Sequence, residues 1–390
     1  MTKDKIKIAC DRAIDNILFE GCTDVDLFSR PYELEFLKDS GFRTELRDTI
    51  VDSILTGDFG KLRLHKIGHV MIPKKNLFDF RRCALVDIYD EIVYLTLVLI
   101  MAHDIEKNRI NKSKGVVFSY RFEIQDNGGV FDPKYNYSAF IDAAKRKTNI
   151  RTNNILVECD LSNFYGRLNI HRIDSTLQSI SAIDTDIISL TNELLLFWAN
   201  RDSYGLPVGS NGSRILAEAA LSAIDKMLRN NIIDFCRFVD DYRFFANSAE
   251  EAHNNLAYFI QCLSRDGITL NIQKTRIIDI SEINHSSKGK NVSVTEELDD
   301  QDNVKQVACP ISQGGFDNEK IGKIIRGYSG TVPTKFRELS QAQKKKYELN
   351  NLNELCVNLE RDALIKPEQL TLFIKSIVAK EEYSFFRECQ

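Results

Sequence analysis

Two aspartates, Asp240 and Asp241, stand side by side in the stretch FCRFVDDYRFF at residues 235–245. The flanking residues alternate with a period of two and are rich in aromatic side chains, which predicts two strands joined by a tight turn. Such turns favour Asn-Gly or Asp-Gly, because their central residues need positive φ. Each carboxylate also makes ionisation of its neighbour more costly. The pair therefore indicates a function that requires concentrated negative charge at the tip of the hairpin.

A third carboxylate, that of Asp160, ends the β-branched, apolar stretch RTNNILVECD at residues 151–160. This stretch predicts a buried strand. If the strand and the hairpin share one sheet, three carboxylates converge, and cations are needed to offset their repulsion. Mg²⁺ is a hard ion that binds carboxylate oxygens and keeps positions for water and phosphate. Two such ions can clamp the attacking and leaving oxygens of a phosphoryl transfer. We therefore expect Asp160, Asp240 and Asp241 to be catalytic residues and Mg²⁺ ligands.

The composition is that of a globular protein, with 43% hydrophobic and 28% charged residues among 390. The longest apolar run, residues 92–102, is shorter than the roughly 20 residues that span a bilayer. The N-terminus reads as an amphipathic helix and lacks the apolar core of a signal peptide. The nine cysteines form no CxxC pair and have no histidine at zinc-ligand spacing. We expect reduced thiols, a cytoplasmic location and no membrane association.

Hydrophobic periodicity predicts a chain that mixes helices and strands, and hence an α+β fold. Helices are expected over residues 1–60, from Ile92 onward, over 213–230 and over 249–265, and strands over 61–85, 151–160 and 267–279. The last strand segment, GITLNIQKTRIID, is expected to be a strand pair. Lysines and arginines gather with aromatic residues between Lys320 and Lys346. This basic segment fits either a surface that follows a phosphate backbone or a solvated helix face.

Five blocks of the chain, in order, resemble those of reverse transcriptases. They read IPKKNLFDFRRCALVDIYDEIVY (72–94), CDLSNFYGRLNIHRI (159–173), GLPVGSNGSRILAEAALSAID (205–225), RFVDD (237–241) and GITLNIQKT (267–275). The resemblance implies a right-hand polymerase with fingers, a palm built on a βαββαβ-type antiparallel sheet, and a helical thumb. The domains implied are an N-terminal helical extension (1–60), fingers (61–150), palm (151–282) and a basic, helical thumb or C-terminal region (283–390).

The resemblance also assigns roles to the acidic residues and their neighbours. Asp160 and Asp240 would bind both metal ions, Asp241 would support the site, and the carbonyl of Leu161 would add a ligand. Tyr165 matches the aromatic steric gate that rejects a ribose 2′-hydroxyl, although simple packing in the core would also explain a tyrosine there.

Further residues are implied to bind the nucleotide. Lys274 could protonate the leaving pyrophosphate or simply pair with a neighbouring acid. Arg81, Arg82 and Lys74 or Lys75 would hold the triphosphate, and arginine suits this role because its planar guanidinium donates two bonds at once. Members of the family often carry glutamine where this chain has valine before the last glycine of the 205–209 loop, which puts polar contacts there in doubt. The implied residues are Lys74, Lys75, Arg81, Arg82, Val208, Gly209 and Lys274.

Within the family, the Asp-Asp block that begins with Phe238 is similar to that of the defence-associated, abortive-infection branch. A retron-type enzyme is also conceivable, but its Val-Thr-Gly and Asn-Ala-x-x-His segments are absent from the sequence. The implied function is RNA-directed DNA polymerisation in defence against phage, with a cognate noncoding RNA as template, dNTPs as substrates, DNA as product, and a possible oligomer. The residues leave open an untemplated, protein-primed polymerase, an RNA-dependent RNA polymerase and a catalytically silent RNA-binding scaffold.

Overall fold

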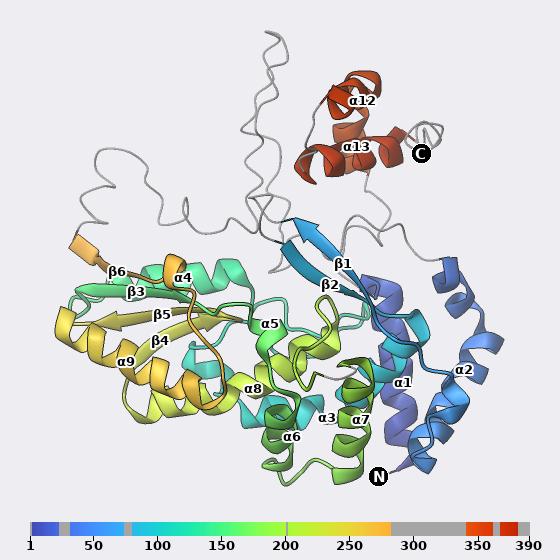
Figure 1. Ribbon diagram of the computed structural model, residues 1–390, viewed down its shortest axis with the longest axis horizontal. Helices are drawn as coiled ribbons and strands as arrows, with labels where there is room; N and C mark the ends of the chain where they lie inside the picture. Colours follow the sequence, from blue (N-terminus) through green and yellow to red (C-terminus); the bar gives the residue numbers. More distant parts are fainter. Residues whose placement is uncertain are drawn as a thin grey trace. The chain divides into compact units, whose positions relative to one another are not determined.

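The computed structural model describes residues 2–22, 32–73, 80–199, 202–281, 341–361 and 367–380. These residues fall into two compact units. The first holds the N-terminal helices and nearly everything described up to residue 281, and the second holds residues 71–73, 80–82 and the C-terminal helices. Figure 1 traces both units along the chain. The boundaries between the four predicted domains stay predictions.

A four-stranded antiparallel sheet forms the centre of the first unit, with its strands in the order β4-β5-β3-β6. Helices separate β3 from the β4–β5 hairpin, and one helix separates the hairpin from β6. This is the predicted βαββαβ order, and the predicted α+β fold is therefore confirmed. The strands are β3 (Ile155–Asp160), β4 (Asp234–Phe238), β5 (Asp241–Ala246) and β6 (Arg276–Asp279).

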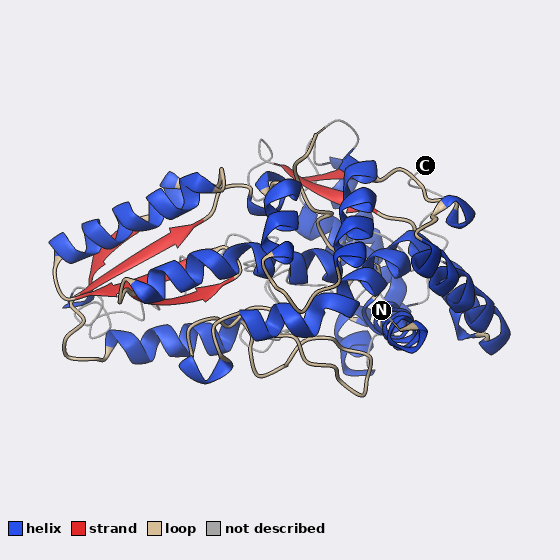
Figure 2. Ribbon diagram, turned by 90° about the horizontal axis from the view of Figure 1, so that it is seen from below, coloured by secondary structure: helices blue, strands red, loops and turns tan. Residues whose placement is uncertain are grey.

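Helices cover both faces of this sheet (Figure 2). On one face the ring of Phe259, from α9 (Ala249–Arg265), lies 4.5 Å from that of Tyr242 in β5. On the other face the guanidinium of Arg243 lies 5.0 Å from the ring of Phe140, in α4 (Tyr137–Thr148). Tyr242 and Arg243 are neighbours in β5, and successive side chains of a strand project to opposite faces. The period-2 pattern of the hairpin therefore places one set of aromatic residues against α9 and the other against α4.

Helix α3 is buried on nearly every side and therefore lies in the core of the first unit. It contacts α1 and α8. The N-terminal helices thus belong to the same compact unit as the sheet. The remaining helices of the first unit are α1 (Lys3–Glu20), α2 (Ser40–Thr56), α3 (Ile88–Asn108), α5 (Phe164–Arg167), α6 (Ile170–Gln178), α7 (Thr185–Ala199) and α8 (Asn211–Asn230), with short 3₁₀ turns η1 (Tyr32–Lys38), η2 (Gly60–Leu62) and η3 (Lys112–Lys114).

Strands β1 (Gly68–Pro73) and β2 (Phe80–Leu85) pair with each other as a two-stranded sheet. In the second unit, α12 (Leu352–Arg361) and α13 (Pro367–Lys380) form a small apolar core of Leu352, Leu355, Phe373 and Ile377. Helix α11 (Gln341–Glu348) precedes them. Most of the basic segment from Lys320 to Lys346, namely residues 320–340, lies outside the described residues. Its predicted role is therefore not tested.

The segment at 267–279 is not the strand pair that its alternating residues predict. Leu270 forms only an isolated bridge with Leu161, and a 3₁₀ turn, η4 (Ile272–Lys274), separates it from β6. The backbone N–H of Asn271 donates to the carbonyl of Asp160, and the N–H of Lys274 donates to the carbonyl of Asn271. These bonds close a turn at the end of β3 and stop the ladder there.

No helix in the described part of the chain is long and apolar enough to cross a membrane. The cysteines of the described residues are all free thiols, and most are buried. This agrees with the prediction that these thiols are reduced.

Candidate active site

The turn of the β4–β5 hairpin consists of Val239 and Asp240, so Asp241 is the first residue of β5 rather than part of the tip. Val239 has a φ of 53°, and Asp240 does not share this positive φ. Positive φ at the first central residue alone is the pattern of a type II′ turn, which normally carries glycine there. Positive φ is rare for a β-branched residue. The backbone of the turn is therefore strained at the residue that precedes the Asp-Asp pair.

The register of the sheet brings the three aspartates to one end of its two central strands. Asp160 lies directly opposite Asp241, and opposed residues of an antiparallel pair project to the same face. The backbone N–H of Leu161 donates to the carbonyl of Asp240, with 3.2 Å between the two atoms. Only 8% of the surface of Asp160 and 6% of that of Asp240 are exposed. Predicted neighbours 80 residues apart in the chain are thus adjacent in space.

Asp160 is held by the segment that follows α9. The side-chain amide of Asn271 donates to Asp160 Oδ2 over 3.1 Å. The ammonium nitrogen of Lys274 lies 3.5 Å from the same oxygen, and 41% of the lysine side chain is exposed. This long contact to a half-exposed lysine is a weak ion pair that a bound cation could replace. Of the two roles predicted for Lys274, the structure therefore shows the pairing with a neighbouring acid, and protonation of pyrophosphate stays a prediction.

Tyr165, the predicted steric gate, lies near both the Val239–Asp240 turn and the loop at residues 205–209, called here the glycine loop. The N–H of Leu206 donates to the carbonyl of Tyr165 over 3.0 Å, which ties the loop to the gate. Burial raises the pKa of Tyr165 well above its ordinary value, and the nearby Tyr120 and Asp240 raise it further. The Tyr165 phenol therefore lies within electrostatic reach of Asp240, one of the three predicted catalytic residues. Tyr165 is itself half-buried, whereas its neighbour Phe164 is fully buried, as expected for a core residue.

The glycine loop uses backbone that other residues would rarely adopt. Gly205 has a φ of 92° and Gly209 a φ of 113°, in the left-handed region that favours glycine. The carbonyl of Val208 accepts a hydrogen bond from the N–H of Ala84 in β2, over 3.3 Å. Val208 thus contributes its backbone carbonyl here, an interaction that does not depend on the identity of its side chain. Binding of an incoming base pair by Val208 and Gly209 stays a prediction.

A buried ionic network lies behind the strained turn. Arg237, in β4, has no exposed surface, and its guanidinium contacts both Glu218 and Asp225 of α8. Burial alone would lower the pKa of Arg237, but Asp225 and Glu218 raise it well above its ordinary value. Burial likewise tends to raise the pKa of Glu218, but Arg109 and Arg237 lower it. The pKa shifts of Arg237 and Glu218 both favour the charged forms, so these two side chains make an ion pair in the interior. Burial raises the pKa of Asp225, although Arg237 acts to lower it.

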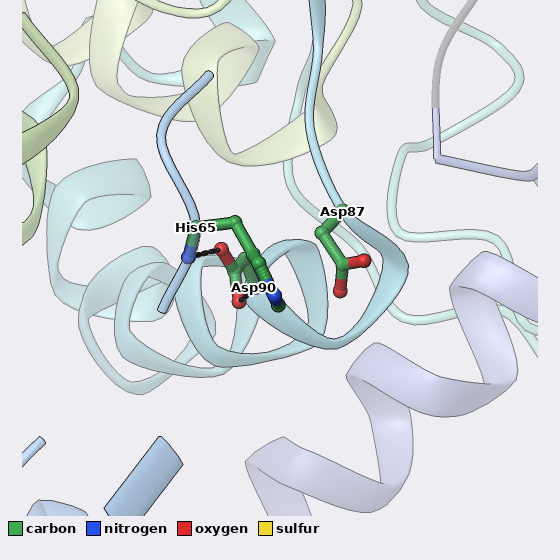
Figure 3. Close-up of side chains that lie close together, drawn as sticks. All are labelled: His65, Asp87 and Asp90. Atoms are coloured by element: carbon green, nitrogen blue, oxygen red, sulfur yellow. Dashed lines mark hydrogen bonds and ion pairs between the residues drawn. The ribbon is translucent and has the colours of Figure 1, made fainter. Parts of the chain in front are cut away.

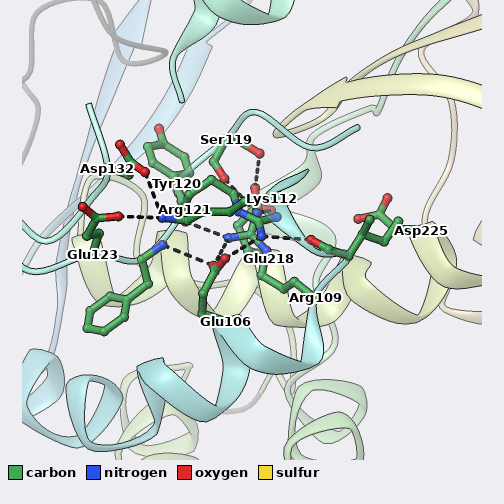
Figure 4. A network of polar contacts seen from close by, with 12 residues as sticks. Glu106, Arg109, Lys112, Ser119, Tyr120, Arg121, Glu123, Asp132, Glu218 and Asp225 are labelled. Carbon is green, nitrogen blue, oxygen red and sulfur yellow. Dashed lines mark hydrogen bonds and ion pairs between the residues drawn. The ribbon is translucent and has the colours of Figure 1, made fainter. Parts of the chain in front are cut away.

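Figure 4 shows the part of this network that surrounds Glu218. Arg109, from α3, contacts Glu218 at 2.5 Å, and the hydroxyl of Ser119 donates to the other carboxylate oxygen at 2.5 Å. Tyr242 donates its hydroxyl to Asp225 over 3.2 Å. Sequence patterns did not predict this network. The available signal was the placement of charged residues at Glu218, Asp225 and Arg237 within otherwise apolar elements.

Four predicted triphosphate ligands are not tested. Lys74 and Lys75 lie outside the described residues. Arg81 and Arg82 lie in β2, where Arg81 is half-buried and Arg82 is exposed. Their predicted role in binding the triphosphate stays a prediction.

One other group of potential metal ligands, His65, Asp87 and Asp90, lies near the N-terminus of α3 (Figure 3). Among the described residues it is the set of three whose ligand atoms all lie within 4.8 Å of one another. Asp160, Asp240 and Asp241, the predicted catalytic residues, are not such a set. Each acid also has a local structural role. Asp87 accepts the N–H of Tyr89 as the helix cap, and Asp90 accepts the N–H of His65 at 2.7 Å. The sequence assigned no role to any histidine, so this group was not predicted.

Comparison with known proteins matches residues 101–307, more than half of the chain, to the family described as reverse transcriptase (RNA-dependent DNA polymerase). No curated protein matches the chain. Among solved structures, an apo telomerase from Candida tropicalis, truncated from its C-terminal domain, is similar with a TM-score of 0.38 and 13% identity. The match covers 63% of this chain and 62% of the telomerase chain. Because the family match includes β3, the glycine loop and the Asp-Asp hairpin, the chain belongs to the reverse transcriptase family of RNA-dependent DNA polymerases.

Proposed function

We propose that the protein copies RNA into DNA by nucleotidyl transfer at Asp160, Asp240 and Asp241. The observation that carries the proposal is the register that sets Asp160 opposite Asp241, with Asp240 in the adjoining turn. A primer hydroxyl would attack the α-phosphate of a dNTP, and pyrophosphate would leave. Positioning and charge neutralisation account for most of the catalysis in such transfers.

The residues present fit two Mg²⁺ ions, because the donors at this end of the sheet are carboxylate oxygens and backbone carbonyls. Asp160 and Asp240 would hold both ions, Asp241 would support them, and Leu161 would offer its carbonyl. Bound Mg²⁺ would supply the positive charge that offsets the phosphate oxygens and activates the attacking hydroxyl. Asn271 orients the Asp160 carboxylate through its hydrogen bond to Oδ2. Lys274 would move from that oxygen toward the pyrophosphate.

Selection of the sugar would rest on Tyr165. Its phenol lies within electrostatic reach of Asp240, and its backbone carbonyl anchors the glycine loop through Leu206. A ribose 2′-hydroxyl would meet the tyrosine ring, whereas a deoxyribose would not. The glycines at 205 and 209 would let the backbone approach the new base pair closely.

We further propose that the template is a cognate noncoding RNA and that the DNA product acts in defence against phage. The support is the resemblance of the Phe238-led Asp-Asp block to that of defence-associated enzymes. The reaction itself is the firmer part of the proposal, since it rests on the site and on membership of the family.

The test is to purify the protein from cells, sequence the RNA and DNA that accompany it, and measure dNTP incorporation in Mg²⁺ with and without RNase. We expect one enriched RNA, and incorporation that RNase abolishes. Incorporation that survives RNase, with DNA remaining attached to protein after denaturation, would point to untemplated, protein-primed synthesis. No incorporation on any primer–template would contradict the proposed reaction.

A further inference from the structure

We propose that Arg237 is a positioning residue that holds the strained Val239–Asp240 turn in the geometry that binds metal ions. The inference rests on the proposed function of the three aspartates and adds a residue that does not touch substrate or metal itself. The contact that carries it is a hydrogen bond from Arg237 Nη1 to the carbonyl of Val239, over 2.9 Å.

The guanidinium of Arg237 uses its donors in several directions at once. Nε donates to Asp225 Oδ1 over 3.0 Å and Nη2 donates to Asp225 Oδ2 over 2.6 Å, so this pair is bidentate. Nη1 and Nη2 also contact the two oxygens of Glu218, at 3.1 and 2.8 Å. Nη1 remains close enough to reach the carbonyl of Val239. The two acids of α8 therefore hold the guanidinium in one orientation, and that orientation presents Nη1 to the turn.

The backbone of Arg237 is anchored as well. Its N–H donates to the carbonyl of Val116 over 2.8 Å, and its carbonyl accepts the N–H of Phe118 over 2.9 Å. The residues around 117 thus form a parallel bridge beside β4. With backbone and guanidinium both anchored, Arg237 can restrain a neighbour that would otherwise relax.

The neighbour that needs restraint is Val239, because its φ of 53° is unfavourable for a β-branched side chain. Strain of this kind persists only where the surroundings over-determine it. The hydrogen bond to the Val239 carbonyl orients the peptide bond that leads directly into Asp240. The position of the Asp240 carboxylate therefore depends on a residue three places earlier, on the face of the sheet opposite Asp241.

Replacement of Arg237 by lysine keeps the positive charge but removes the fork of donors. One ammonium nitrogen with three donors cannot reproduce the bidentate contacts to Asp225 and Glu218 together with the bond to the Val239 carbonyl. We expect the turn to relax and the ions to bind about 10- to 100-fold more weakly, the effect typical of losing an outer partner of a metal ligand. The KM for dNTP should rise in parallel, because the triphosphate is bound through the same ions.

The matched control is Arg243→Lys. Arg243 is also buried, in β5 of the same sheet, where its Nε lies 3.4 Å from Glu158 and its guanidinium stacks on Phe140. No contact joins it to the turn among the described residues. Both variants should unfold at lower temperature than the wild type. Only Arg237→Lys should change metal binding.

The experiment is titration of the full-length wild type, Arg237→Lys and Arg243→Lys with Mn²⁺, monitored by the electron paramagnetic resonance of the free ion, alongside thermal unfolding. Weaker Mn²⁺ binding in Arg237→Lys alone supports the inference. Equal binding in all three proteins overturns it, even if Arg237→Lys is less stable. If the wild type itself binds no Mn²⁺, the proposed two-ion reaction is contradicted. The inference, which rests on that reaction, is then contradicted as well.

If Arg237→Lys does not fold, Asp225→Asn takes its place. This change keeps the size of the side chain but removes one of the two charges that orient the guanidinium. A smaller loss of Mn²⁺ affinity, of about threefold to tenfold, supports the inference. Unchanged affinity in a folded Asp225→Asn protein overturns it.

Discussion

Two groups of acidic side chains in this protein differ in what holds them. The ligand atoms of His65, Asp87 and Asp90 lie closer together than those of the three aspartates proposed to be catalytic, yet their hydrogen bonds are those of a helix start. The Asp160, Asp240 and Asp241 group is placed by strand register, by a strained turn and by a buried ionic network. Short distances between ligand atoms therefore do not identify the active site. The stronger sign is local strain maintained by a buried ionic network.

The largest expected effect comes from making the same substitution in each group. Asp240→Asn should lower dNTP incorporation at least about 1,000-fold, since it removes several kcal/mol of metal-mediated stabilisation. Asp90→Asn should keep most of the activity. Primer-extension rates for both purified variants provide the measurement. Similar losses in the two variants would erase the distinction between the groups.

A smaller effect is expected from Tyr165, the proposed steric gate, on the choice between dNTPs and NTPs. Tyr165→Val should reduce the preference for dNTPs over NTPs roughly 100-fold, because the ring that meets the 2′-hydroxyl is lost. Phe164→Leu serves as the control, since Phe164 is buried in the core and should affect stability alone. The ratio of kcat/KM values for dGTP and GTP reports the preference. An unchanged ratio in Tyr165→Val would assign Tyr165 to packing.

The first turn of α3 should contribute to the pH dependence of stability through Glu91. Burial raises the pKa of Glu91 from 4.5 to about 8, although the hydroxyl of Ser210 donates to it. At pH values between 4.5 and about 8, Glu91 is deprotonated in the unfolded chain and protonated in the folded chain. The free energy of unfolding therefore falls as pH rises through this range. Glu91→Gln should remove this fall, which amounts to roughly 1.4 kcal/mol per pH unit. Urea unfolding at pH 5, 6 and 7 measures it, and parallel curves for variant and wild type would refute it.

The smallest effect is expected from the helix cap in the same group. Asp87→Ala should lower the free energy of unfolding by about 1 kcal/mol, because the N–H of Tyr89 loses its acceptor. Mn²⁺ affinity should stay that of the wild type. A loss of Mn²⁺ affinity instead of stability would make this group a metal site.

Much of this arrangement follows from sequence patterns. The hairpin, the strand that ends at Asp160 and the helix over 249–265 are where periodicity and turn residues predict them, because each follows from a local pattern of apolar residues. The sequence led only to the expectation that this strand and the hairpin share one sheet. The register between β3 and β5 was not predicted, since it depends on contacts 80 residues apart.

Other features could not be predicted. Positive φ at Val239 contradicts the turn preference of valine and exists because Arg237 and the sheet hold it. The turn at Asn271 replaced an expected strand because its backbone and amide both bond to Asp160. The partners of Arg237 are Glu218 and Asp225, whose charges within an otherwise apolar stretch of α8 are a local signal. That signal does not identify Arg237 as their partner, because the contact is made only in the folded chain. In each case tertiary contacts override a local preference.

The most direct test of the account is to locate Mn²⁺ in crystals of the full chain by anomalous diffraction. The account predicts Mn²⁺ between the carboxylates of Asp160 and Asp240. Mn²⁺ bound at His65, Asp87 and Asp90, with none at the aspartates of the sheet, would contradict it.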